Sequence, residues 1–127
     1  FFEALMKYHE TEKRGNITVI RFEPFKISHP GHYPPTKELA SMLVEHYDNK
    51  HDPIIILGIS PDSVTFRADN IKGFDVNEII ARIKEEMPYA IAEGGGHPVA
   101  GTIRFVEAAY DDVIPFIYKY INEVSGA

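Results

Sequence analysis

The sequence predicts an α/β fold, in which a mixed β-sheet of about four to five strands carries helices on both faces. Two observations predict it. Segments with apolar residues three and four positions apart alternate along the chain with short runs rich in β-branched residues. Residues 54–59, IIILGI, contain no polar side chain, which is typical of a strand buried at the centre of a sheet. The expected order is helix, strand, helix, strand, strand, helix, brief strand, strand, helix.

The first part of the chain is expected to contain two helices and one strand. Phe1–Arg14 has apolar residues at helical spacing and is followed by Gly15, a common residue just after helices. Ile17–Phe22 alternates in a pattern that predicts a strand. The three prolines of Phe25–Pro35 predict a loop, and Thr36 then serves as N-cap of the second helix. The apolar face of that helix comprises Leu39, Ala40, Leu43, Val44 and Tyr47.

The middle of the chain is expected to form a hairpin followed by a helix. Ser60–Ser63 has proline at its second position, as a type I turn favours, so Val64–Ala68 is the predicted return strand. Asp75 is a predicted N-cap with Glu78 three positions later, a variant of the capping box. Pro88 is expected to end that helix, because proline removes a backbone hydrogen bond.

The remainder of the chain is expected to return to the sheet and then form the last helix. Tyr89–Ala92 predicts a brief strand before a glycine run, and Thr102–Val106 predicts a strand after it. Asp111 or Asp112 is the expected N-cap of the last helix. Acidic residues are favourable at a helix N-terminus, so this interpretation is preferred over a metal site.

Composition indicates a folded globular protein, and residues 1–127 are expected to form a single domain. There is no cysteine, which excludes disulfides and Cys-ligated zinc. The chain begins with Phe rather than Met, so we expect an excised domain whose catalytic partner domain lies outside it. The longest purely apolar run, Ile54–Leu57, is far too short to span a membrane. We therefore expect a cytoplasmic protein with no membrane partner.

The net charge of −6 lies in one part of the chain. Residues 1–50 sum to zero, whereas residues 51–127 carry six basic and twelve acidic side chains. Proteins that hold duplex DNA by charge alone are normally basic. Any contact with nucleic acid is therefore expected to be local and geometric rather than a broad basic groove.

The segment EGGGHPVAG, residues 93–101, contains three consecutive glycines. Such a run can present backbone N–H groups to a phosphate with no side chains in the way, and His97 would add a ring donor at its rim. Alternatively, it can be a tight connection that needs positive φ, with His97 merely solvated. For a glycine triplet alone the second interpretation is favoured. The spacing does not fit a dinucleotide-binding or Walker-type loop.

Residues 94–101, GGGHPVAG, resemble the GGGHxxAG signature of the DHH-associated domain, the C-terminal domain of the DHH phosphoesterase superfamily. That superfamily includes RecJ-like single-strand exonucleases, oligoribonucleases and cyclic-dinucleotide phosphodiesterases. The family also places an arginine on the strand before the central helix, and Arg67 in VTFRA matches it. The resemblance is specific from about Pro53 to Val106, and it favours the functional interpretation of the glycine run.

The resemblance implies a substrate-binding role for this domain. Residues Gly94, Gly95, Gly96 and His97 would meet substrate phosphate, and Arg67 would contact phosphate or an adjacent base. The Asp-His-His motif is absent, so the resemblance implies no catalytic residue and no metal ligand in this chain. It places manganese and the attacking water in a DHH domain of the full-length protein. The fragment alone is then expected to be inactive.

The interpretation drawn from the resemblance is a RecJ-like exonuclease domain that binds single-stranded nucleic acid or a short oligonucleotide. One alternative is the substrate domain of an oligoribonuclease or nucleotide phosphatase. Another is a non-catalytic interaction module of a replication assembly, which the acidic balance favours slightly and the intact GGGH and Arg67 disfavour.

Other candidate residues have plainer explanations. His29 and His32 have a spacing that could bind a metal, but no third ligand is evident and a solvated loop is favoured. Arg104 could join Arg67 at a phosphate, although an ion pair with a nearby acid is preferred. The remaining histidines are expected at the surface or on helix faces: His9, His46 and His51.

Aromatic side chains could stack on unpaired bases. Burial in the core is the favoured interpretation for Phe22. For Phe25 and Tyr33 the two possibilities are evenly balanced.

Overall fold

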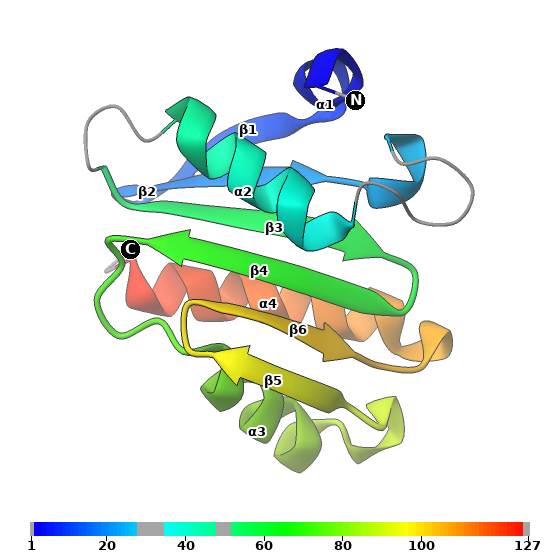
Figure 1. Cartoon of the computed structure of the whole chain (residues 1–127). Helices are drawn as coiled ribbons and strands as arrows, with labels where there is room; N and C mark the ends of the chain where they lie inside the picture. The colour runs from blue at the N-terminus through cyan, green and yellow to red at the C-terminus, as the bar shows by residue number, and fades with distance from the viewer. Residues whose placement is uncertain (1, 28–34, 48–51, 126–127) are drawn as a thin grey trace.

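The computed structural model describes residues 2–27, 35–47 and 52–125 and places their strands in one mixed sheet (Figure 1). The strands are β1 Glu10–Arg14, β2 Ile17–Phe22, β3 Ile54–Ser60, β4 Ser63–Asp69, β5 Glu93–His97 and β6 Ala100–Arg104. The α-helices are α1 Phe2–Tyr8, α2 Thr36–Tyr47, α3 Val76–Glu86 and α4 Tyr110–Val124. Short 3-10 helices are η1 Pro24–Lys26, η2 Pro88–Ala90 and η3 Glu107–Ala109. The α/β fold is confirmed, with six strands rather than four to five.

The strand order across the sheet is β1-β2-β3-β4-β6-β5. Strands β2 and β3 pair in parallel, with Thr18 opposite Ile54, and α2 forms the crossover between them. The other neighbouring strands pair antiparallel. The sheet is therefore built from three hairpins, β1–β2, β3–β4 and β5–β6.

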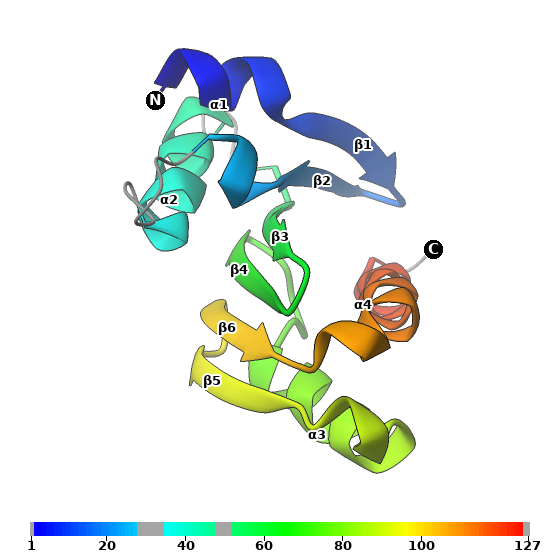
Figure 2. The same ribbon diagram turned by 90° about the vertical axis from the view of Figure 1, so that its right-hand side faces the viewer.

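The sheet separates two hydrophobic cores. Figure 2 shows α1 and α2 on one side of the sheet and α3 and α4 on the other. Side chains alternate along β2, so Ile17 and Val19 pack with α3 and α4, whereas Ile20 and Phe22 pack with α1 and α2. Strand β3 contributes to both cores, as its unbroken apolar run predicts, and the expected burial of Phe22 is confirmed.

The helix predicted over Phe1–Arg14 is wrong in its second half. Helix α1 ends at Tyr8, and Glu10–Arg14 forms strand β1, joined to β2 by a turn in which Gly15 has φ +58°. Glu10 lies opposite Arg21, and Arg14 opposite Ile17. The helical pattern was misleading because the edge strand buries no apolar side chain, and its pairing with β2 is a tertiary effect.

Two other boundaries also differ from the predictions. Tyr89–Ala92 is not a strand, since Pro88–Ala90 forms η2 and the chain enters β5 only at Glu93. Helix α4 begins at Tyr110, so Asp111 and Asp112 lie in its first turn rather than at its N-cap. Their position at the helix N-terminus still agrees with the favourable helix dipole.

The predicted cap of α3 is confirmed. The N–H of Asn77 donates to the Asp75 carboxylate at 2.9 Å. The reciprocal half of a capping box is not formed, because the Glu78 carboxylate bonds instead to Arg82 on α3 and lies 3.2 Å from the Tyr120 hydroxyl. The start of α3 is therefore fixed by Asp75 and by contact with α4.

The helices cover the sheet unequally. On the α1 and α2 side, α2 packs on β3 and β4, and the sheet continues beyond α2 through β6 and β5 (Figure 1). We call this part of the sheet surface, formed by β4, β6 and β5 on the α2 side, the open face. None of the helices in the described residues is long and apolar enough to cross a membrane.

Candidate functional site

The three glycines of the motif lie in the edge strand β5 rather than in a loop. Gly94, Gly95 and Gly96 have φ values of +133°, +135° and +135°, which residues with a Cβ rarely adopt. A Cβ at Gly94 would overlap the carbonyl oxygen of Thr102, and one at Gly96 would lie 3.0 Å from that of Ala100. Positive φ belongs to the alternative interpretation of the glycine run, although it occurs here in a strand rather than in a turn. This backbone geometry alone accounts for the three glycines.

The turn of the β5–β6 hairpin is held from two directions. The N–H of Ala68 on β4 donates to the carbonyl of Val99 at 2.8 Å, and the N–H of Val76 on α3 donates to that of Pro98 at 2.9 Å. The N–H of Val99 lies 3.4 Å from Nδ1 of His97. With Nδ1 as acceptor, the neutral imidazole carries its proton on Nε2, so the exposed ring presents an N–H donor.

Strand register brings Arg67 and His97 into one row. Arg67 on β4 pairs with Ala100 on β6, and Ala100 pairs with His97 on β5. Directly paired residues of antiparallel strands point to the same face. Neighbouring strands are about 4.8 Å apart, so the Cα atoms of Arg67 and His97 are separated by roughly 10 Å across the small Ala100. The row therefore places the two predicted polar residues on the open face.

The Arg67 side chain is exposed and makes no hydrogen bond or ion pair within the described part of the chain. Beside it is a hollow of about 50 Å³ between α2 and the sheet. The residues that line this hollow are Lys37, Ala40, Ser41, Thr65, Phe66, Arg67, Ala100 and Gly101. Ala100 and Gly101 belong to the GGGHPVAG motif, so Arg67 and the motif line the same hollow.

Packing beneath the hollow depends on two features of β6. The hydroxyls of Thr65 and Thr102 are 3.1 Å apart and hydrogen-bond across β4 and β6. A Cβ at Gly101 would lie 2.7 Å from the carbonyl oxygen of Gly95, so the final glycine of the motif allows β5 to approach β6 closely. The motif thus determines how β5 and β6 pack together.

Helix α3 supports the hairpin from the other side of the sheet. The Asn77 side-chain amide donates to the carbonyl of Gly96 at 3.2 Å. The start of α3 is held in turn by Tyr120, whose hydroxyl accepts from the N–H of Asp75 at 3.0 Å. Burial raises the pKa of Tyr120 to about 12, so the hydroxyl stays protonated at neutral pH. A chain of contacts therefore runs from α4 through α3 to β5.

Arg104 lies near the end of β6, exposed and on the same face as Arg67 by strand alternation. Its register partners are Ser63 and Glu93. The ion pair expected for Arg104 is not found among the residues that the structure describes.

The remaining candidates lie away from the open face or outside the described ranges. The ring of Phe25 is 65% exposed. His9 on the α1 side hydrogen-bonds the Tyr47 hydroxyl at 2.6 Å, and the His46 ring packs edge-on against Tyr47. Residues 2–27, 35–47 and 52–125 contain no group of three or more metal-ligating side chains. Four candidates lie outside the described residues: His29, His32, Tyr33 and His51.

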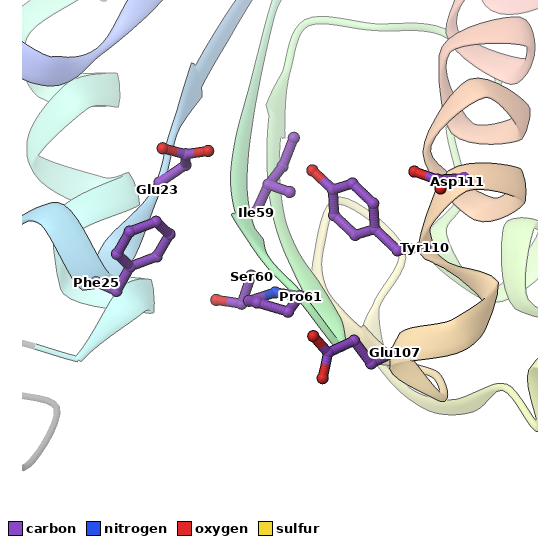
Figure 3. Close-up of a pocket in the computed structure, with 8 residues that line it drawn as sticks. All are labelled: Glu23, Phe25, Ile59, Ser60, Pro61, Glu107, Tyr110 and Asp111. Atoms are coloured by element: carbon purple, nitrogen blue, oxygen red, sulfur yellow. The ribbon is translucent and has the colours of Figure 1, made fainter.

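A second, larger pocket of about 370 Å³ lies between η1 and η3, at the end of β3 (Figure 3). We call it the acidic pocket, because Glu23, Glu107 and Asp111 line it and its described lining contains no lysine or arginine. The other lining residues are Phe25, Ile59, Ser60, Pro61 and Tyr110. Glu23 is paired with Lys26 at 2.6 Å. The carboxylates of Glu107 and Asp111 oppose the binding of a phosphate, so this pocket is a poor candidate for the predicted substrate contact.

Some residues of the site were missed by sequence reasoning. Lys37, Ser41 and Thr65 line the hollow, yet no motif marks any of them. Lys37 lies in the first turn of α2, which begins at the predicted N-cap residue Thr36, and only the packing of α2 on β4 places it near Arg67.

Comparison with known proteins finds relatives but no matching family model. An uncharacterised protein of Methanocaldococcus jannaschii is 35% identical over 86 residues, which are 65% of this chain and 11% of that protein. A solved structure described as the DHH domain of a member of the s1p family of ribosomal proteins has a TM-score of 0.85 at 26% identity. It matches 95% of this chain, which spans 29% of that structure.

RecJ from Thermus thermophilus, solved in complex with Mg²⁺, has a TM-score of 0.51 at 15% identity. The match covers 94% of this chain and 16% of RecJ, and at this identity it shows a shared fold. The chain therefore spans only a minor part of each of these proteins.

Proposed function

The chain belongs to the DHH-associated domains, and from this we propose that it holds substrate phosphate for a catalytic DHH domain of the same protein. The substrate we propose is single-stranded nucleic acid or a short oligonucleotide, as for a RecJ-like exonuclease. The observation that carries the proposal is the row formed by Arg67, Ala100 and His97 across β4, β6 and β5.

The chemistry of this row suits a phosphate. The Arg67 guanidinium offers several N–H donors in a planar fork, and a phosphate accepts two of them at once. Its lack of a described partner leaves those donors available. The exposed His97 adds the Nε2–H donor, and the glycines of β5 present an edge without side chains. Since positive φ already explains the glycines, the proposal depends mainly on Arg67 and His97.

The catalytic step is proposed to belong to the DHH domain, where manganese would activate water and stabilise charge on the leaving oxygen. The described residues of this chain do not fit such a metal, since they hold no group of three ligands. The contribution of this chain is then to bind and orient phosphate. The proposed division of labour predicts no hydrolysis by the chain alone, with or without manganese.

A non-catalytic interaction module is the second candidate, favoured by the acidic pocket and the net charge of −6. Such a module would not require an unpaired arginine beside the glycine motif. The two functions differ in their dependence on Arg67 and His97.

The test is a titration of the 127-residue chain with a short single-stranded oligonucleotide, followed by backbone amide chemical shifts. Arg67→Gln and His97→Ala should each weaken binding by about 1.5–3 kcal/mol, because each removes a hydrogen bond to a charged group. Lys84→Gln on α3 is the matched control, since Lys84 is exposed on the opposite side of the sheet. Melting curves should be unchanged for all three variants. Equal binding by parent, Arg67→Gln and His97→Ala would refute the proposal.

A further inference from the structure

Helix α2 brings another cation to the hollow beside Arg67. Lys37 lies in the first turn of α2 and lines this hollow together with Ser41 of the same helix. Like Arg67, Lys37 is exposed and has no hydrogen bond or ion pair with any residue that the structure describes. The hollow is therefore lined by two cations that come from different elements, α2 and β4, and that are available to a ligand.

The lining of the hollow favours an anion. Among the residues that the structure describes, it includes two cations and two hydroxyls, from Ser41 and Thr65, and no carboxylate. The Thr65 hydroxyl already bonds to Thr102, which leaves Ser41 as the hydroxyl at the α2 wall. On a chain with a net charge of −6, this local reversal of charge attracts negative groups to the open face.

The hollow and the His97 ring lie on opposite sides of Ala100. Lys37 and Ser41 approach Arg67 from α2, which packs on β3 and β4, whereas His97 is on β5 beyond β6. The separation of roughly 10 Å between the Cα atoms of Arg67 and His97 leaves room for two phosphate groups in succession. The open face therefore offers two anion positions rather than one.

We propose that Lys37 and Ser41 of α2 form, with Arg67, a second phosphate position next to the one at His97. This inference rests on the proposed function. On this proposal α2 is a positioning element, because its phosphate position directs the substrate backbone from β5 toward α2. It also implies that the preferred ligand carries at least two neighbouring phosphates.

The experiment titrates the 127-residue chain with a 5′-phosphorylated dinucleotide at several salt concentrations, using amide chemical shifts. Single-stranded ligands give a slope of log affinity against log salt of about −0.7 per phosphate contacted, so the parent should give about −1.4. Lys37→Gln should make the slope shallower by about 0.7 and lower the affinity about tenfold. Lys84→Gln should keep the parent slope and affinity, and the melting temperature of both variants should match the parent.

The outcomes separate this inference from the proposed function. If Lys37→Gln retains the parent slope and affinity while Arg67→Gln and His97→Ala lose binding, α2 takes no part and the inference is overturned, whereas the proposed function stands. If all three variants bind like the parent, both are refuted. A shallower slope for Lys37→Gln with binding lost in the other two variants supports both.

Discussion

The open face and the acidic pocket are two concave regions of one sheet, and they carry opposite charge. The hollow on the open face is small, and within the described part of the chain it is lined by Lys37 and Arg67 and by no carboxylate. The acidic pocket is several times larger than this hollow, and its lining residues in the described ranges include three carboxylates and neither lysine nor arginine. Of these two regions, the acidic pocket offers the larger volume, whereas the open face offers the charge that suits an anion. For an anionic ligand the sign of charge decides, because like charges repel.

The two regions also differ in how they are supported. The open face depends on the β5–β6 hairpin, which is held by β4 and α3 through Val99 and Pro98. The acidic pocket is formed by η1, η3 and the end of β3 and takes no residue from that hairpin. Changes to the hairpin should therefore affect the open face first.

The largest effect is expected for Gly94→Val. A β-branched residue at φ +133° is strained, and its Cβ would overlap the Thr102 carbonyl, so β5 should separate from β6. We expect a loss of about 4 kcal/mol or more in unfolding free energy, measured by urea denaturation. Gly73→Ala is the control, since Gly73 has positive φ but a Cβ there would meet no atom within 4 Å, so only backbone strain of about 1–2 kcal/mol applies. Equal losses in the two variants would contradict the steric argument.

A smaller effect is expected for Tyr120→Phe, which removes the hydroxyl that holds the start of α3. The loss should be about 1–2 kcal/mol at neutral pH, since the N–H of Asp75 loses its partner. The native pKa of about 12 is above the ordinary value of 10.0. The hydroxyl therefore stabilises the fold fully below pH 10, and this contribution is lost as the pH rises through 12.

Urea denaturation of parent and Tyr120→Phe at pH 7, 9 and 11 tests this pH dependence. The difference in unfolding free energy should be constant from pH 7 to 9 and should shrink by pH 11. A difference that stays constant or grows at pH 11 would mean that burial does not raise this pKa.

Thr65→Val, at the floor of the hollow, should lower the unfolding free energy modestly. The variant loses the hydrogen bond to Thr102 but keeps a similar volume, so about 1 kcal/mol of unfolding free energy should be lost. Thr102→Val should cost a similar amount, and the double variant should cost less than the sum. Additive losses in this double-mutant cycle would show that the two hydroxyls do not interact.

The smallest effect on ligand binding is expected for substitutions in the acidic pocket. The double variant Glu107→Gln with Asp111→Asn removes two negative charges at η3 and α4, on the side of the sheet away from the open face. At physiological salt its affinity for a short oligonucleotide should differ from the parent by less than about twofold, because exposed distant charges are screened. A tenfold change in the same amide titration would place the ligand near the acidic pocket.

Much of the fold could be predicted from local sequence signals. The apolar run of β3, the hairpin turn after it and the Asp75 cap each depend on neighbouring residues, and the structure agrees with all three. Strand β1 could not be predicted in this way. Its residues ETEKR have no apolar face, and they form a strand only because β2 offers a free edge.

The candidate site was predictable only in part. The glycine motif and Arg67 were identified through family resemblance, and the structure places Arg67 and His97 in one row. The conformation of the glycines could not be deduced, since a positive-φ strand and a phosphate loop both require glycine. Lys37 could not be identified either, because its proximity to Arg67 arises from packing between α2 and β4.

The parallel pairing of β2 with β3 has a consequence for how the chain folds. Thr18 meets Ile54 only after a long crossover, whereas β3–β4 and β5–β6 are joined by short turns. Contacts between residues close in sequence form faster, because less chain entropy is lost in closing the intervening loop. We therefore expect residues 54–124 to form a nucleus into which β1, β2 and α2 dock later. The wall of the hollow that contains Lys37 would then be among the last parts of the molecule to assemble.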